Sequence, residues 1–235
     1  MTLFFLATRI FFREIKSGQM IIMLMSLTVA IGILSSIALF SDRLQKSLDA
    51  ESKEFLGGDL KFESSYELDE SLMPKIDFDL SEIYVFGSVL SFGDEFRLAT
   101  VKSVDVNYPL EGEIELNNAI NNYFVSAPPK RGEIWLDKRI LDFLGVEIGK
   151  NISLGDRDFL LSNTIVSEPD RGSSSFAFAP RAIINSLDLE ETNVIKPGSR
   201  VRYMYLFKAE PKSLEILENH FQNIKKPGDE IVFFN

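Results

Sequence analysis

Three absences limit the chemistry available to this 235-residue chain. It contains no cysteine, which excludes disulfides and thiolate chemistry, and its only histidine is His220. One histidine without cysteine cannot supply the common zinc sites, and nothing around it suggests a Ser-His-Asp arrangement. The segment Gly172–Phe176 (GSSSF) lacks the final glycine of a nucleophile elbow, and no GxxxxGK[ST] loop is present to bind nucleotide phosphates. The sequence therefore predicts no catalytic residue, no metal site and no cofactor, and hence not an enzyme.

Acidic residues outnumber basic ones over most of the chain. Arg9, Arg13, Lys16 and Glu14 precede Asp42, which leaves 22 basic and 34 acidic residues from Asp42 onward, a net charge of −12. Nucleic acids and anionic lipid surfaces are bound through basic patches. This part of the chain is therefore not expected to have a nucleic-acid partner.

A long run without charge is the strongest signal in the sequence. No charged residue occurs from Ser17 to Ser41, and Met20–Phe40 (MIIMLMSLTVAIGILSSIALF) is almost wholly apolar. About 20 apolar helical residues cross a bilayer core, so residues 20–40 are predicted to form a transmembrane helix. The basic residues that precede this run place the N-terminus in the cytoplasm by the positive-inside rule. Residues 42–235 are then expected on the periplasmic or extracytoplasmic side.

A cleaved secretory signal is the alternative interpretation of the same run. Ser36-Ile37-Ala38 has the small-x-small pattern that a signal peptidase accepts. The apolar region of a signal peptide is only about 7–15 residues long, whereas this run is about twice that length. A retained anchor is therefore the favoured prediction.

Helical patterns flank the predicted span on both sides. Residues 1–19 contain an amphipathic pattern with Arg9, Arg13 and Lys16 on one face, which predicts a cytoplasmic helix at the membrane interface or, alternatively, a plain basic flank. Residues 41–58 keep a helical pattern until Gly57-Gly58, with no proline to interrupt it. The membrane helix is therefore predicted to continue as a helical stalk.

After Asp59 the hydrophobic pattern changes to that of strands mixed with short helices, which indicates an α+β fold. Strands are predicted at 59–63, 83–92, 95–104, 133–136, 152–154, 159–166, 200–208 and 230–234, and helices at 138–144 and 211–223. Asp137 is the expected cap and Gly145 the end of the shorter helix. Residues 117–132 are expected to be irregular, and 181–187 to form a short amphipathic helical turn.

The order of these elements predicts two subdomains. Residues 59–104 and 197–235 are expected to form one discontinuous α+β subdomain, with a β-rich subdomain, 105–196, inserted into it. The first subdomain should pair strand 59–63 or the 83–104 hairpin with strand 200–208.

Several short motifs, in order, resemble the periplasmic core domain of MacB-like and FtsX-like ABC transporter permeases, a family that includes the LolC/LolE pair. They are FLGGDL (55–60), VKSVD (101–105), YPLEG (108–112), GEIWLD (132–137), LG (144–145), EPD (168–170), FAPR (178–181) and PGSRV (197–201). The ordered set is most similar to the YbbP-type branch of predicted permeases. Taken singly, these residues are predicted to be turn and packing positions.

The resemblance implies a bacterial inner-membrane permease component that relays ATP-driven motion to a periplasmic domain handling lipid, lipoprotein or peptide cargo or a partner. It implies a cytoplasmic ABC-type ATPase subunit and the lipid bilayer as partners, and a second permease copy or a periplasmic protein as a further partner. Family members continue into further membrane helices, whereas this chain stops at Asn235. The expectation is therefore a fragment or a reduced relative. The alternative function is a membrane-anchored periplasmic binding or scaffold protein that is not coupled to ATP.

Overall fold

The computed structural model describes residues 5, 18–69, 71, 73–170 and 179–233 of the chain. The chain divides into two compact units, one reaching Asp49 and the other comprising Ala50–Asn235. The predicted interfacial helix, 1–19, lies outside the described residues except at positions 5, 18 and 19. The segment 172–176 (GSSSF), which the sequence analysis rejected as a nucleophile elbow, also lies outside the described residues.

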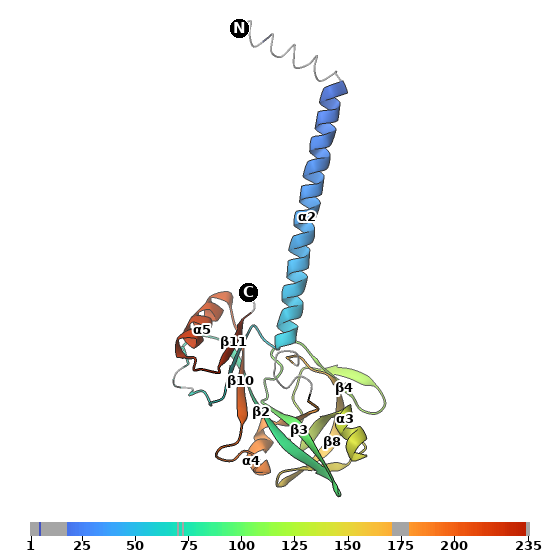
Figure 1. Cartoon of the computed structure of the whole chain (residues 1–235), viewed down its shortest axis with the longest axis vertical. Coiled ribbons are helices and arrows are strands. Elements are labelled where there is room, and N and C mark those ends of the chain that lie inside the picture. Colours follow the sequence, from blue (N-terminus) through green and yellow to red (C-terminus); the bar gives the residue numbers. More distant parts are fainter. Residues whose placement is uncertain (1–4, 6–17, 70, 72, 171–178, 234–235) are drawn as a thin grey trace. The chain divides into compact units, whose positions relative to one another are not determined.

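Helix α2 carries the predicted membrane span. It runs without interruption over Gly18–Leu56, and its part Met20–Leu44 is long and apolar enough to cross a membrane, with a mean hydropathy of 2.3 (Figure 1). Two polar side chains of the span bond within the helix: Ser26 Oγ donates to the Met23 carbonyl and Thr28 Oγ1 to the Leu24 carbonyl, each over 2.8 Å. Such internal bonds satisfy hydroxyl groups that lipid could not satisfy. The helix ends at Leu56, and Gly57 follows it with a φ of +73°.

The described residues of the second unit form a mixed sheet of eleven strands, which confirms the predicted α+β class. The strands are β1 (Leu60–Ser64), β2 (Asp79–Phe92), β3 (Glu95–Val104), β4 (Ile114–Asn117), β5 (Asn122–Val125), β6 (Glu133–Asp137), β7 (Asn151–Leu154), β8 (Arg157–Ser167), β9 (Arg181–Asn185), β10 (Val201–Lys208) and β11 (Glu230–Phe233). The helices are α3 (Lys138–Leu144), the 3₁₀ turn η3 (Ser186–Asp188), α4 (Leu189–Thr192) and α5 (Pro211–Ile224). The strand order is β11-β1-β10-β2-β3-β9-β6-β8-β4-β5, with β7 joining β8 back to β2.

One end of the sheet is an antiparallel layer covered by α5. Strand β1 pairs with both β11 and β10, and β10 pairs with β2, as the sequence predicted for 200–208. Leu214, Leu217 and Phe221 of α5 are buried against this layer. Phe221 stacks on Phe62 with ring centroids 4.5 Å apart. Burial of the apolar face of α5 therefore stabilises the packing of this helix on the antiparallel layer.

The other end of the sheet closes into a six-stranded barrel. The circuit runs through β2, β3, β9, β6, β8 and β7, because β7 pairs with β8 on one side and with Leu90 and Ser91 of β2 on the other. Buried residues from all six strands fill its interior, and Ile140 and Leu144 of α3 pack against them. Asp137 caps α3 and Gly145 ends it in the left-handed conformation, as predicted.

Strand β2 of the long β2–β3 hairpin belongs to both the antiparallel layer and the barrel. Residues 79–86 of β2 pair with β10, and residues further along the same strand pair with β7 in the barrel. The proposed boundary between two subdomains at residues 105 and 196 stays a prediction, since Ala50–Asn235 forms one compact unit.

Two predictions of local structure were wrong. The segment 117–132 was expected to be irregular, but it contains β5, which pairs with β4 across a turn in which the Asn117 and Asn118 side chains accept backbone N–H groups. Residues 181–187 were expected to form a helical turn, but Arg181–Asn185 is the wholly buried strand β9 between β3 and β6. Three consecutive apolar residues, 182–184, show no periodicity that separates a buried strand from a helix.

Candidate functional site

The candidate functional site is the junction at which the chain leaves α2 and enters the sheet. We define it as Gly57-Gly58 together with the residues that contact them. The Gly57 carbonyl accepts a hydrogen bond from the Glu111 N–H over 3.1 Å, and Asp59 N–H donates to the Phe207 carbonyl over 2.9 Å. A side chain at Gly58 would come within 3.1 Å of the Phe207 carbonyl oxygen. The exit from α2 is therefore held directly by backbone contacts to β10 and to the 108–112 loop.

A buried charge cluster lies against this junction. A β-carbon on Gly57 would lie 3.8 Å from the Cβ atoms of both Pro169 and Asp170. Lys102 Nζ contacts Asp170 Oδ1 at 2.6 Å, Glu168 Oε2 at 3.2 Å and the Tyr108 hydroxyl at 2.6 Å. Arg181 Nη1 forms an ion pair with Glu168 Oε1 at 3.1 Å. We refer to Lys102, Tyr108, Glu168, Asp170 and Arg181 as the junction cluster.

The junction cluster is balanced in charge and closed to solvent. The Lys102, Glu168 and Asp170 side chains are fully buried, and that of Arg181 is 3% exposed. Two cations thus face two carboxylates in a site from which water is excluded. Removal of one partner from such a site leaves an uncompensated buried charge, which costs about 3–5 kcal/mol.

Tyr108 connects the cluster to the surrounding apolar core. Its hydroxyl lies 3.0 Å from Asp170 Oδ1, and Lys102 Nζ lies 4.2 Å from the centroid of its ring. Burial, followed by the nearby carboxylates of Asp170 and Glu168, raises the pKa of Tyr108 well above its ordinary value. The phenol therefore remains protonated and can donate to Asp170 throughout the physiological pH range.

The sheet register brings the two cations of the cluster to one face. In the parallel pairing of β3 with β9, Thr100 lies opposite Arg181 and Lys102 opposite Ile183, so residues 100, 102 and 181 share a face. The loop after β8 supplies Glu168 and Asp170, and the loop after β3 supplies Tyr108. Segments far apart in sequence thus meet at the end of α2.

The sequence reasoning named no site residue and did not find this cluster. Its members occur in the motifs VKSVD, YPLEG, EPD and FAPR, which were interpreted as turn and packing positions. A lysine in the middle of a strand that also contains Val101 and Val104 was the available signal, because a charge within a central strand needs a buried partner.

His220, the lone histidine, lies on α5 with its ring 5.5 Å from that of Phe221. Among the described residues, no group of three His, Asp or Glu side chains is placed to hold a metal ion.

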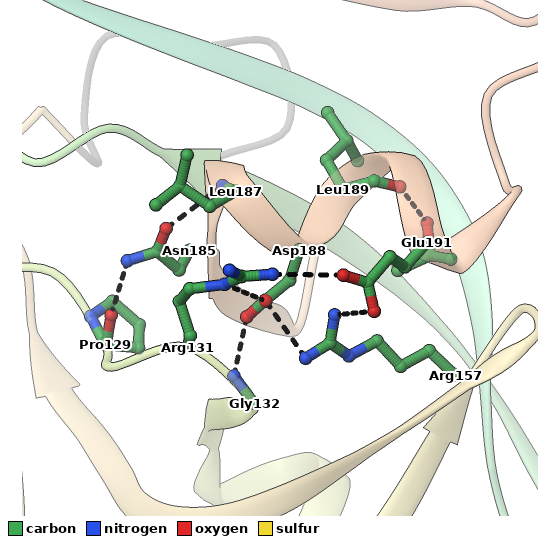
Figure 2. Close-up of polar contacts among 10 residues, drawn as sticks. Pro129, Arg131, Gly132, Arg157, Asn185, Leu187, Asp188, Leu189 and Glu191 are labelled. Carbon is green, nitrogen blue, oxygen red and sulfur yellow. Dashed lines mark hydrogen bonds and ion pairs between the residues drawn. The ribbon is translucent and has the colours of Figure 1, made fainter.

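A second ionic cluster fastens the α4 segment to the barrel (Figure 2). Asp188, which is fully buried, accepts hydrogen bonds from the Gly132 N–H at 2.6 Å and from Arg131 Nε at 3.2 Å, and pairs with Arg157 Nη2 at 3.0 Å. Glu191 pairs with the same two arginines. The turn between β9 and β10 is therefore fixed by side chains from two other parts of the barrel.

A curated protein is similar to this chain over nearly its whole length. It is 30% identical over 222 residues to the uncharacterized ABC transporter permease YbbP of Escherichia coli K12, a match that covers 93% of this chain. The resemblance to MacB/FtsX-like permeases is thereby confirmed. The chain spans only 27% of the length of that relative. No family model matches the sequence.

The fold is also that of a known periplasmic domain. The crystal structure of the periplasmic region of MacB from Actinobacillus actinomycetemcomitans aligns with a TM-score of 0.51 at 12% identity, covering 79% of this chain and 93% of that one. At this identity the likeness concerns the fold alone. It supports a MacB-like core domain following the candidate membrane helix.

Proposed function

We propose that this chain is a permease component of an ABC transporter of the MacB/FtsX/LolCE type. In this proposal, α2 crosses the bacterial inner membrane with its N-terminus in the cytoplasm, and residues 42–235 are extracytoplasmic. A separate ABC-type ATPase subunit supplies the energy, and the chain itself catalyses no reaction. A second permease copy, or further membrane helices, completes the membrane part.

The observation that carries the proposal is the continuity of α2. The helix begins before the apolar segment Met20–Leu44 and ends only at Leu56, where Gly57 enters the folded unit against the junction cluster. A continuous helix can transmit a displacement, whereas a flexible linker cannot. We therefore infer that motion of the membrane segment is relayed through α2 to the extracytoplasmic domain, which handles lipid, lipoprotein or peptide cargo or a partner protein.

The absence of cysteine from the sequence makes a direct test possible, because introduced cysteines are labelled without background. The full-length permease is reconstituted with its ATPase in nanodiscs, with a spin label at Asp94→Cys in the β2–β3 turn. Pulsed electron resonance then measures the distance between the labels of two permease copies, with and without ATP and vanadate. The expected result is a distance distribution that changes with nucleotide.

The matched variant carries Gly-Gly inserted between Leu48 and Asp49. Two glycines cost about 2 kcal/mol of helix propensity and allow the helix to bend there. ATPase binding and hydrolysis should persist, and the nucleotide-dependent distance change should be lost. If the insertion left the distance change intact, α2 would be a tether and the relay would be wrong. If the unmodified protein showed no nucleotide response while bound to an active ATPase, the scaffold alternative would replace the permease proposal.

A further inference from the structure

A groove of about 640 Å³ lies between the sheet and the α4 segment. Its acidic and aromatic lining has no role in the permease proposal. One wall is formed by β2 and β10, and the other by η3, α4 and the residues that follow them, which lie beside these strands in Figure 1. The side chains that define its chemistry are Glu67, Glu82, Asp105, Glu190, Tyr84 and Tyr203. No lysine or arginine lines it among the described residues.

The aromatic part of the groove is a pair of tyrosines from adjacent strands. Tyr84 and Tyr203 lie opposite each other in the β2–β10 register, with ring centroids 5.5 Å apart and an interplanar angle of 72°. Burial, and then the carboxylates of Glu82 and Glu67, raise the pKa of Tyr84. Among the described residues, neither Glu67 nor Glu190 has an ion-pair partner. The groove thus combines aromatic faces with these two carboxylates.

A buried hydroxyl without a partner lies on the same face of the sheet as Tyr84. Ser103 lies directly opposite Tyr84 in the β2–β3 register, so its side chain is on the same face of the sheet as the groove. It is fully buried, and its Oγ has no hydrogen-bond partner within the described part of the chain. Buried hydroxyl groups are ordinarily paired, and this one belongs to the cross-strand neighbour of Tyr84 and does not itself line the groove.

The arrangement of the acidic groups favours an organic cation over a metal ion. No three carboxylates of the described residues converge closely enough to hold a metal. Spread carboxylates around aromatic rings instead match an ammonium or guanidinium group on an apolar stem, since a cation is attracted to the ring face and the stem packs on it. We propose that this groove binds an alkylammonium or guanidinium group.

The groove is also held in shape before any ligand arrives. The α4 wall is fixed by the Arg131–Arg157–Asp188–Glu191 cluster of Figure 2, and Thr192 Oγ1 donates to the Leu189 carbonyl over 2.6 Å. The opposite wall consists of two paired strands. A site with fixed walls loses little conformational freedom on binding, which increases affinity.

Two sources supply this chemistry, a free polyamine and a lysine or arginine side chain on a partner protein, and two probes distinguish them. Isothermal titration calorimetry on the full chain, in nanodiscs of neutral phosphatidylcholine at low ionic strength, measures binding of spermidine and of N-acetyl-lysine amide. The tighter probe identifies the source. Absence of binding by both probes overturns the proposal.

Three variants separate a specific site from general attraction to an acidic protein. Glu67→Gln with Glu190→Gln should weaken binding about fivefold or more, and the uncharged change Tyr84→Leu about threefold or more. Glu215→Gln, an exposed carboxylate on α5, is the matched control and should leave affinity unchanged. If Glu215→Gln weakened binding as much as the double variant, or if the loss of the tyrosine ring had no effect, the groove would not be the site. Tyr203→Leu replaces Tyr84→Leu if the latter lowers the melting temperature.

Discussion

Replacement of Lys102 by methionine tests whether the junction cluster holds the end of α2. Methionine keeps most of the volume of the lysine stem and removes the charge, so that Arg181 is the one cation of the junction cluster that remains, among the described residues, to face Glu168 and Asp170 in a fully buried site. Breaking a buried ion pair on one side costs about 3–5 kcal/mol, a large fraction of the roughly 5–15 kcal/mol that stabilises a typical domain. We expect Lys102→Met to lower the free energy of unfolding by that amount.

The assay is urea unfolding of the full chain in detergent, followed by the fluorescence of Trp135. This is the only tryptophan, and it is 5% exposed in the apolar cluster that also contains Tyr108, so its emission reports on the relevant core. The matched control is Lys208→Met. Lys208 Nζ pairs with Glu111 Oε1 at 2.7 Å, but the two side chains are 46% and 34% exposed, and such pairs are worth about 0–1 kcal/mol.

A second variant separates loss of charge balance from loss of packing. Asp170→Asn combined with Lys102→Met leaves one cation and one carboxylate in the cluster, which restores neutrality. The double variant should therefore be less destabilised than the sum of the two single changes, with a coupling of about 1–3 kcal/mol. The reasoning is refuted if Lys102→Met costs no more than Lys208→Met, or if the two changes in the cluster are additive.

Two further predictions concern the barrel and the groove. Gly155→Ala should lower the free energy of unfolding by more than about 3 kcal/mol, because its Cβ would lie 2.0 Å from the Thr192 carbonyl oxygen in addition to the left-handed φ of +60°. Gly93→Ala, at a φ of +59° with open space around the Cβ, isolates the backbone strain and should cost only about 1–2 kcal/mol, so equal losses in denaturant melts would argue against the clash. Burial raises the pKa of Tyr84, so the unfolded chain ionises first and stability should fall as the pH rises above about 10. Tyr84→Phe should leave stability at pH 7 nearly unchanged and reduce that alkaline slope by about 1.4 kcal/mol per pH unit, whereas an unaltered slope in unfolding measured from pH 9 to 12 would contradict it.

Much of the secondary structure could be predicted because it depends on local rules. The Gly93-Asp94 turn between two apolar runs predicted the β2–β3 hairpin, and Asp137 with Gly145 fixed both ends of α3. The pattern failed where tertiary burial decides the outcome. The run Arg181–Asn185 is a strand only because β3 and β6 lie on either side of it, and the Asn-rich 117–132 segment pairs only because β8 offers β4 an edge.

The sequence alone determined that α2 is long and apolar enough to cross a membrane, that it ends before Gly57 and that common catalytic motifs are absent from the sequence, because hydrophobic length, helix termination and residue inventory are properties of consecutive residues. The tertiary structure alone decided that Lys102, Tyr108, Glu168, Asp170 and Arg181 meet beneath Gly57, and that Tyr84 and Tyr203 face Glu190 across a groove. Those groups come from β2, β3, β9, β10, α4 and the loops between strands. Their proximity follows from a sheet order that joins β3 to β9 and β7 to β2, which is set by the closure of the barrel around a shared apolar core.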